Sequence, residues 1–491
     1  MAFLVASAFC YAAVAQETYK RADDVLAVVV QGADGPVVGA RLSVRGTTIT
    51  AVTDQNGRAA ISGLAPGEYV IEIVADGYRI AEIAVDVPRP ADSPLVVEIE
   101  ENESEVVIST TRTGSEIENT PTRVEAIDEE EIDEKSSMRS SNVSMLLNES
   151  TGIKVQQTSA TTFTQSIRIQ GLDGRYTQLL KDGFPAFGGF SGNLSVLDIQ
   201  PLDLKQVEII KGASSTFYGG GAIAGVINFI SKEPGNAPHT SFILNQTSAL
   251  GSDLSAFHTR RHGRFGTTLF GAFSFQNPYD ADGDEFTELP LTASFTLNPR
   301  LFVYGKGSRL MLGNSTSYQF RDGGQIDAVR GRDPAQYLES HRSIRNITTI
   351  QFDKDLDDGG KLYLKQAVAF FRRTSEIPGY RFGGNQVNSF TEVSIFKPHG
   401  KHLLVFGANA IFDEFSEDGL APNPRDESRQ TVGGFVQGTF DLGKRLSIEA
   451  GTRVDGVNNY GVFVLPRISL LYHLSERISG RVTVGFGYKT P

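Results

Sequence analysis

The alternation of apolar and polar residues in the C-terminal half, residues 234–491, constrains this chain more than any other feature. Along 265–276, Phe265, Leu269 and Phe273 fall on one face of an extended strand, and Thr268 and Ser274 fall on the other. Successive side chains of a strand point to opposite faces, so this spacing predicts strands with one apolar face. The half contains about thirteen such segments, which predicts a mainly β fold.

The connections between these strands fall into two classes. Short turns are expected at 262–264, 298–300, 357–360, 397–400, 442–444 and 474–476, and long polar loops at 277–289, 314–345, 376–388 and 416–429. This alternation is typical of β-barrels that span an outer membrane. Periodicity alone leaves a soluble β-sandwich open, because that fold would bury the apolar face that a barrel turns to lipid.

Residues 165–233 carry the most specific motifs. Short apolar strands are expected at 167–169, 177–180, 207–210 and 226–230, with a hairpin turn at Asp182 and Gly183. The motifs in chain order are Arg168 with Gly171, Asp182 with Gly183, Glu208 with Lys211 and Gly212, Tyr218 with Gly219, and Gly225 with Asn228. Taken together they resemble the plug domain of TonB-dependent outer-membrane receptors.

The resemblance implies a mainly β receptor with an α+β plug domain at 120–233 and a transmembrane antiparallel β-barrel at 234–491. Within the plug, short helices are expected at 128–135 and 140–147. The resembling family closes its barrel with 22 strands. The chain is therefore expected to be truncated within the barrel.

The N-terminal part has two expected segments. Residues 1–15 are expected to be a signal peptide, because the apolar run ends in Ala13-Val14-Ala15; a buried N-terminal strand or helix stays open. Residues 24–100 alternate apolar and polar residues between turns, which predicts a small β-sandwich. The stretches 39–40, 53–57 and 67–69 resemble the carboxypeptidase-regulatory-like domain. No histidine occurs there, and a structural spacer is expected.

Residues 101–119 form an acidic linker that contains one β-prone segment. Such charged runs are usually solvated and extended. The segment consists of Glu105, Val106, Val107, Ile108, Ser109, Thr110 and Thr111. It can add a strand to the sheet edge of another protein, and by its position it resembles the TonB box; a strand leaving the sandwich is the alternative.

The chain offers no constellation for catalysis. Its net charge of −12 argues against a nucleic-acid partner. The aspartates of 280–284 resemble the start of a calcium loop, but Glu285 stands where glycine is needed and Leu291 where glutamate is needed. We therefore expect no enzyme, no cofactor and no metal site, and a solvated loop at 280–284; weak calcium binding by that loop is the alternative.

The resemblance also implies a lock between plug and barrel. Plug arginines of the family pair with barrel glutamates, and Arg168 and Glu449 are the matching candidates here. Lys211 stands where the family often has arginine, and lysine cannot make the planar bidentate contact. Glu449 paired only with its barrel neighbours is the alternative.

The expected function is that of a TonB-dependent receptor in the outer membrane of a Gram-negative-type bacterium. Its implied partners are TonB with the inner-membrane energising complex, the membrane lipid and a small-molecule ligand. A ferric siderophore is the first expectation for that ligand, and cobalamin, haem or a glycan stays open. A signal-transducing receptor and an adhesive β protein are the alternatives from other classes.

Overall fold

The computed structural model describes residues 25–490 except 33–34, 46, 48, 76–77, 79–80, 90–93, 100–119, 139–140, 160–164, 188–198, 236, 334, 358, 401, 419–423, 444 and 476–477. The expected signal peptide and the segment Glu105–Thr111 lie outside these residues. The chain divides into two compact units, Met1–Glu105 and Val106–Pro491, and each is described by itself. No helix in the described part of the chain is long and apolar enough to cross a membrane.

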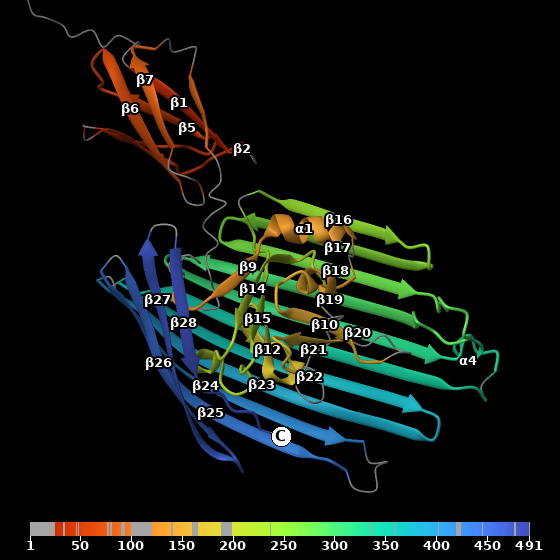
Figure 1. The fold of residues 1–491 in the computed structure, drawn as a ribbon. Helices are drawn as coiled ribbons and strands as arrows, with labels where there is room; N and C mark the ends of the chain where they lie inside the picture. The colour runs from red at the N-terminus through yellow and green to blue at the C-terminus, as the bar shows by residue number, and fades with distance from the viewer. Residues whose placement is uncertain are drawn as a thin grey trace, which may run out of the picture. The chain divides into compact units, whose positions relative to one another are not determined.

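The first unit is a β-sandwich of two four-stranded sheets (Figure 1). One sheet contains β1 (Val25–Gly32), β2 (Gly35–Pro36), β5 (Arg58–Ser62) and β8 (Leu95–Glu98); the other contains β3 (Arg41–Val44), β4 (Thr50–Val52), β6 (Gly67–Val74) and β7 (Ala81–Val87). Alternation along β5 turns Ala59 and Ile61 inward and the residues between them outward. They pack with Leu42, Ile71 and Ile73 in one core.

Thr53 joins two turns of this sandwich from a buried position. Its hydroxyl donates to the Val37 carbonyl at 2.7 Å and accepts the Ala40 amide at 2.8 Å. Thr53→Val keeps the shape but leaves both backbone groups without their partner, so we expect residues 24–100 to lose about 1–3 kcal/mol of unfolding free energy. Urea titration of that fragment would measure the loss. Thr50→Val, at an exposed position of β4, should stay within about 0.5 kcal/mol; equal losses would contradict the assignment.

The second unit begins with a plug of mixed structure. Its elements are β9 (Val124–Ile127), α1 (Glu129–Met138), α2 (Ser144–Asn148), β10 (Ile153–Gln157), β11 (Gln165–Ile169), η3 (Gly174–Tyr176), β12 (Thr177–Lys181), β13 (Phe184–Pro185), β14 (Leu204–Lys211), α3 (Ser215–Tyr218) and β15 (Gly225–Ser231). Five strands pair in the order β13-β12-β15-β14-β9, and β10 pairs with β11. The apolar runs of β14 and β15 are buried at the centre, where Ile209 and Phe229 pack with Ile132 of α1.

The hairpin turn predicted in the plug joins β12 to β13. Lys181 pairs with Phe184, which leaves Asp182 and Gly183 as a two-residue turn. Their φ angles are 54° and 73°. Two positive φ values are typical of the type I′ turn, whose twist matches that of the strands it joins.

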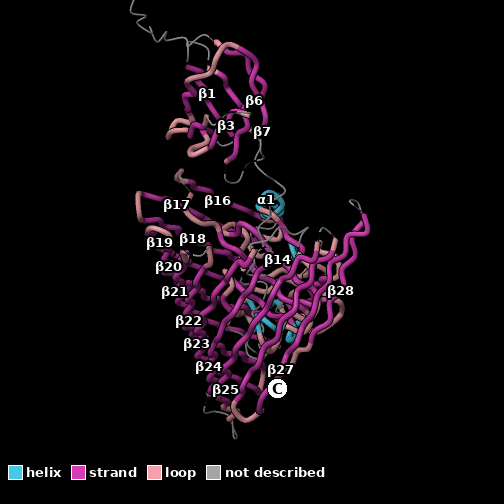
Figure 2. Tube along the Cα trace, turned by 90° about the vertical axis from the view of Figure 1, so that its left-hand side faces the viewer, coloured by secondary structure: helices cyan, strands magenta, loops and turns pink. Residues whose placement is uncertain are grey.

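The rest of the second unit is one antiparallel sheet of 13 strands in chain order, as the alternation predicted. Its strands are β16 (His239–Gln246), β17 (Gly251–His262), β18 (Phe265–Gln276), β19 (Leu291–Gly305), β20 (Ser308–Gly324), β21 (Leu338–Asp355), β22 (Lys361–Ile377), β23 (Tyr380–His399), β24 (His402–Glu417), β25 (Glu427–Leu442), β26 (Leu446–Val457), β27 (Gly461–Ser475) and β28 (Ile478–Gly485). A short helix, α4 (Ile326–Val329), follows β20. Figures 1 and 2 show the sheet curving around the plug.

The distribution of apolar and polar side chains between the two faces of this sheet excludes a soluble β-sandwich. Phe265, Leu269 and Phe273 of β18 are 59%, 49% and 48% exposed, whereas Thr268 between them is 2% exposed. On β26 the buried side chains include Glu449 and Asp455. Apolar groups outside and charges inside would be unfavourable in water, but they suit a wall that faces lipid.

Aromatic side chains interrupt the polar inner face where the plug touches it. Phe257 and Phe270 pack with Leu202 of the plug. Phe217 of α3 meets the ring of Phe435 edge to face at 5.6 Å between centroids. These contacts explain why β18 carries the inward-facing Phe270 within an otherwise small and polar face.

Three expected connections are wrong. The segment 298–300 is no turn, because β19 runs through it and the turn falls at 306–307; Pro299, which has no N–H, sits where the ladder to β20 lacks paired residues. The expected loop 376–388 is a continuous hairpin of β22 and β23. The expected loop 314–345 shrinks to 325–337. Polar stretches thus extend the strands, because ladder bonds form irrespective of side-chain polarity.

Candidate functional site

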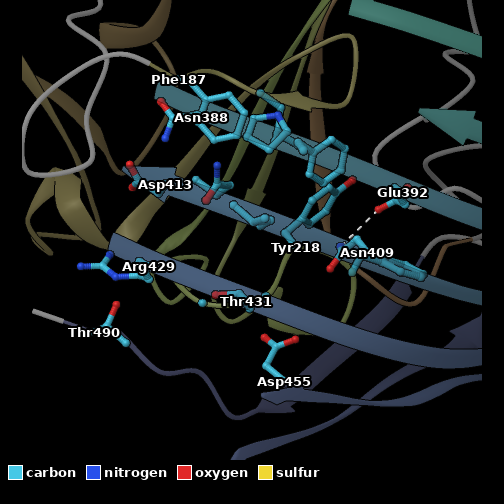
Figure 3. Close-up of a pocket in the computed structure, with 18 of the residues that line it drawn as sticks. Phe187, Tyr218, Asn388, Glu392, Asn409, Asp413, Arg429, Thr431, Asp455 and Thr490 are labelled. Atoms are coloured by element: carbon cyan, nitrogen blue, oxygen red, sulfur yellow. Dashed lines mark hydrogen bonds between the residues drawn. The ribbon is translucent and has the colours of Figure 1, made fainter. Parts of the chain in front are cut away.

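A cavity of about 180 Å³ lies between the plug and the inner face of the sheet (Figure 3). The plug contributes the chain after the β12–β13 hairpin, including Phe187, and the end of α3, including Tyr218. The sheet contributes β23 to β26, and residues 488–490 close one side. Asp413 and Arg429 flank the long loop between β24 and β25, so the cavity lies toward the long-loop end of the wall.

Both signs of charge line the cavity. The carboxylates are Glu392, Asp413 and Asp455, and the cations are Arg429, Arg453 and Lys489. Asn409 donates to Glu392 Oε2 at 3.4 Å, the contact drawn in Figure 3. The aromatic residues of the lining are Phe187, Phe217, Tyr218, Phe390 and Tyr488. A cavity with this lining can bind an amphipathic solute by stacking and by charge-assisted hydrogen bonds.

Arg453 and Asp455 form a fully buried ion pair at the floor of the cavity. Arg453 Nε lies 2.6 Å from Asp455 Oδ1, although the angles there do not meet those of a hydrogen bond. Arg453 Nη2 donates to Asn409 Oδ1 at 2.7 Å, and the Tyr488 hydroxyl donates to Asp455 Oδ2 at 2.9 Å. The hydrogen bonds fix both side chains of the pair in place.

The motif at Tyr218 and Gly219 packs directly on this pair. A Cβ on Gly219 would lie 3.2 Å from both Arg453 Nε and Asp455 Oδ2, and the φ of Gly219 is +71°. A Cβ on Gly220 would lie 2.7 Å from the Tyr488 ring. Only glycine therefore allows the plug backbone to approach the wall this closely.

Glu449 accepts a hydrogen bond from the plug, but its partner is Thr122 and not Arg168 or Lys211. Its Oε1 accepts the Thr122 hydroxyl at 2.6 Å and pairs with Arg467 of β27. Arg467 also donates to Thr122 Oγ1 at 2.7 Å and to the Ala213 carbonyl at 3.0 Å. The plug therefore contributes a hydroxyl and a carbonyl, and the wall contributes both charges.

The expected pairing of Arg168 and Lys211 with Glu449 is wrong. Arg168 lies on β11 opposite Lys154 and reaches the Gly171 carbonyl at 3.5 Å. Lys211 pairs within the plug, with Glu125 of β9. Burial raises the pKa of Glu125, but hydrogen bonds from Lys211 and Ser150 outweigh it and hold that pKa below its usual value. Sequence position could not show that β14 turns Lys211 toward β9 rather than toward the wall.

Asp182, Gly183 and Asn228 come together at the plug hairpin. The Gly183 amide donates to Asn228 Oδ1 at 3.0 Å, and the Ser231 amide donates to Asp182 Oδ1 at 2.7 Å. Arg300 of β19, which the motifs did not indicate, reaches Asp182 Oδ2 at 3.2 Å. This is a second charged contact between plug and wall.

The remaining motif residues lie inside the plug. Glu208 is buried on β14 and accepts from Gln206 at 3.0 Å. Gly212 has a φ of +100° in open space. Gly225 packs its Cα against the Ile210 carbonyl. These residues shape the plug and do not line the cavity.

The aspartates of the expected solvated loop at 280–284 lie close together in the structure. Ligand atoms of Asp280, Asp282, Asp284 and Glu288 lie within 4.8 Å of one another. Asp280 accepts the amides of Gly283 and Glu285, and Glu288 accepts that of Ala281. The carboxylates therefore order the loop through its own backbone, and we assign no metal to it.

Sequence reasoning missed most of the cavity wall. Asn388, Glu392, Asn409, Asp413 and Arg429 were not singled out. All lie at positions whose parity turns them inward on β23, β24 and β25. Polar residues at every second position of neighbouring strands are the signal that could have found them.

Three family models match consecutive parts of the chain. A carboxypeptidase regulatory-like domain matches residues 25–100, a TonB-dependent receptor plug domain matches 116–226, and a TonB-dependent receptor-like β-barrel matches 232–491.

Two curated relatives align with about two thirds of this chain at low identity. The chain is 23% identical over 373 residues to the iron-regulated outer membrane virulence protein of Vibrio cholerae, covering 66% of this chain and 51% of that protein. It is 25% identical over 360 residues to the vitamin B12 transporter BtuB of Vibrio vulnificus, covering 69% and 56%. The chain thus spans about half the length of the curated relatives it matches.

The solved structures share the fold at low identity. A variant of the ferric enterobactin receptor PfeA of Pseudomonas aeruginosa superposes with a TM-score of 0.63 at 16% identity, covering 79% of this chain and 64% of that one. The siderophore receptor PirA of Acinetobacter baumannii superposes with a TM-score of 0.61 at 17% identity, covering 75% and 61%.

Proposed function

The chain belongs to the TonB-dependent receptors of the outer membrane, and from this premise we propose that it takes up a scarce solute with energy supplied through TonB. The family and its solved members are transport receptors rather than enzymes. The observation that carries the proposal is the cavity, because plug and wall line it together. A solute bound there touches both parts, so its binding can alter how the plug sits in the wall.

We propose a ferric siderophore as the solute. Several solved neighbours are siderophore receptors, and one curated relative is iron-regulated. The cavity supports this choice through its aromatic rings and its mixed charges, which suit an amphipathic chelate. Cobalamin is the second candidate, because BtuB is a comparable relative. Haem and glycans are tested after these two.

The proposed route of energy begins at the segment Glu105–Thr111. TonB would pair with it as an added strand, and tension would pass along the linker to Thr122 and β9. Thr122 bonds the wall through Glu449 and Arg467, and two residues earlier the Thr120 carbonyl accepts from Arg481 of β28 at 3.1 Å. These are the first described contacts between plug and wall that such tension meets.

Uptake of a radiolabelled ferric siderophore by cells that express the complete gene would test the proposal. Val107→Pro removes a strand donor in the middle of the segment, and uptake should fall to the level of cells without the gene. The matched control is Ser115→Pro, which places a proline in the same linker beyond the segment and should leave uptake near that of the parent.

The outcomes separate the parts of the proposal. Uptake in the parent and in Ser115→Pro, but not in Val107→Pro at equal surface expression, supports active transport of this solute class. Uptake in none of the three rejects the siderophore, and labelled cobalamin is then tested with the same variants. Full uptake in Val107→Pro rejects the segment as the TonB contact.

A further inference from the structure

The outer face of the sheet carries an apolar band that reaches nearly to the short-turn end of β18 to β20. Strand register places Thr267, Leu301, Leu312 and Ile350 side by side in one row across it. The next row toward the short turns contains Phe265, Val303 and Leu310. Phe265 is 59% exposed and Leu301 is 38% exposed. Both rows therefore belong to the surface that faces lipid.

Arg260 of β17 extends the first of these rows. It pairs directly with Thr267, and both side chains are exposed on the outer face. Two residues of a strand span roughly 7 Å, so Arg260 stands about one row inside the end of the apolar band. A cation at this depth is unfavourable unless its head reaches an anion or water, and the long arginine side chain can extend toward the membrane surface.

No anion in the described part of the chain pairs with Arg260. It forms no ion pair or hydrogen bond with any residue that the structure describes. Its basic neighbours are engaged elsewhere: Arg261 lies 3.9 Å from the centroid of the Tyr304 ring, and Arg264 donates to the Tyr304 carbonyl at 3.2 Å. The stretch 258–268 contains no acidic residue. None of the residues described therefore balances the charge of Arg260, and an anion from the surroundings can do so.

The short-turn end of such a wall faces the periplasm. We propose that Arg260, with Thr267 beside it and His262 one row nearer the turn, binds the phosphate of an acidic glycerophospholipid in the periplasmic leaflet. The planar guanidinium pairs with two phosphate oxygens, and the threonine hydroxyl can donate a further hydrogen bond. The surplus positive charge at 258–268 favours a lipid with net negative charge over a zwitterionic one, whose ammonium it repels.

Native mass spectrometry of the full-length receptor in detergent would test this site. Dioleoylphosphatidylglycerol or dioleoylphosphatidylcholine is added at matched concentrations, and retained lipid is counted. We expect the parent to retain phosphatidylglycerol in preference, and Arg260→Gln to weaken that binding by about tenfold, as the loss of a charge-assisted contact implies. Arg260→Lys should recover part of the binding.

Arg261→Gln is the matched control, because it removes a cation from the adjacent residue whose side chain contacts Tyr304. It should retain phosphatidylglycerol as the parent does. Equal retention of both lipids by the parent would overturn the preference for an acidic lipid. Unchanged binding in Arg260→Gln would overturn the site, and an equal loss in both variants would show general charge attraction instead. Neither solute nor TonB enters the measurement, so its result stands apart from that of the uptake experiment.

Discussion

Glu449→Leu is expected to lower the unfolding free energy of the plug by about 3–5 kcal/mol, because it leaves the buried Arg467 without its counter-charge. The same change removes the acceptor of the Thr122 hydroxyl, a contact of plug and wall that lies two residues after the one between Thr120 and Arg481. The midpoint of plug unfolding, followed in detergent by urea titration and protease sensitivity, would measure the loss.

Two further variants separate this pair from a general effect. Glu414→Leu replaces an exposed glutamate of β24 and should lower the unfolding free energy by less than about 0.5 kcal/mol. Adding Arg467→Met to Glu449→Leu should recover part of the loss, since a buried pair replaced as a whole costs less than one left half-paired. If Glu449→Leu alone were as stable as Glu414→Leu, the proposed stabilising role of the pair between Glu449 and Arg467 would be rejected.

Gly225→Ala is expected to prevent the plug from reaching its native packing, at a cost above about 4 kcal/mol. Gly225 opens the central strand β15, between Thr177 of β12 and Lys211 of β14. A Cβ there would lie 2.2 Å from the Ile210 carbonyl oxygen, a distance that only a backbone shift could relieve. Protease sensitivity of the plug in the purified receptor would show the effect.

Two other glycines serve as controls for Gly225→Ala. Gly212 has a φ of +100° but open space around it, so Gly212→Ala should cost only the backbone strain of about 1–2 kcal/mol. Gly235 has neither a positive φ nor a neighbour within 4 Å, and Gly235→Ala should be close to neutral. If all three variants behaved alike, the close approach at Ile210 would not be what requires glycine.

The cavity was the part of the site that the sequence could not assemble. Tyr218 and Gly219 were recognised as a motif. Their neighbours in the cavity, Asn409 and Asp455, lie on strands that follow about two hundred residues later in the chain. Alternation could assign each of these residues to a face of its strand. It could not set the register that brings β24 and β26 against the end of α3, because register depends on ladder bonds and turns along the whole sheet.

The sequence alone determined most of the strands and the two faces of each, because these rest on a period of two residues and on turn chemistry that act locally. The plug was expected from motifs whose types and order resemble those of the family. Tertiary structure decided which way the faces point and which charges meet. It turned the apolar face of β18 outward and paired Glu449 with Thr122 and Arg467 instead of Arg168. The reason is physical: a buried charge takes the nearest partner that the packed backbones present, and that choice has no signature in local sequence.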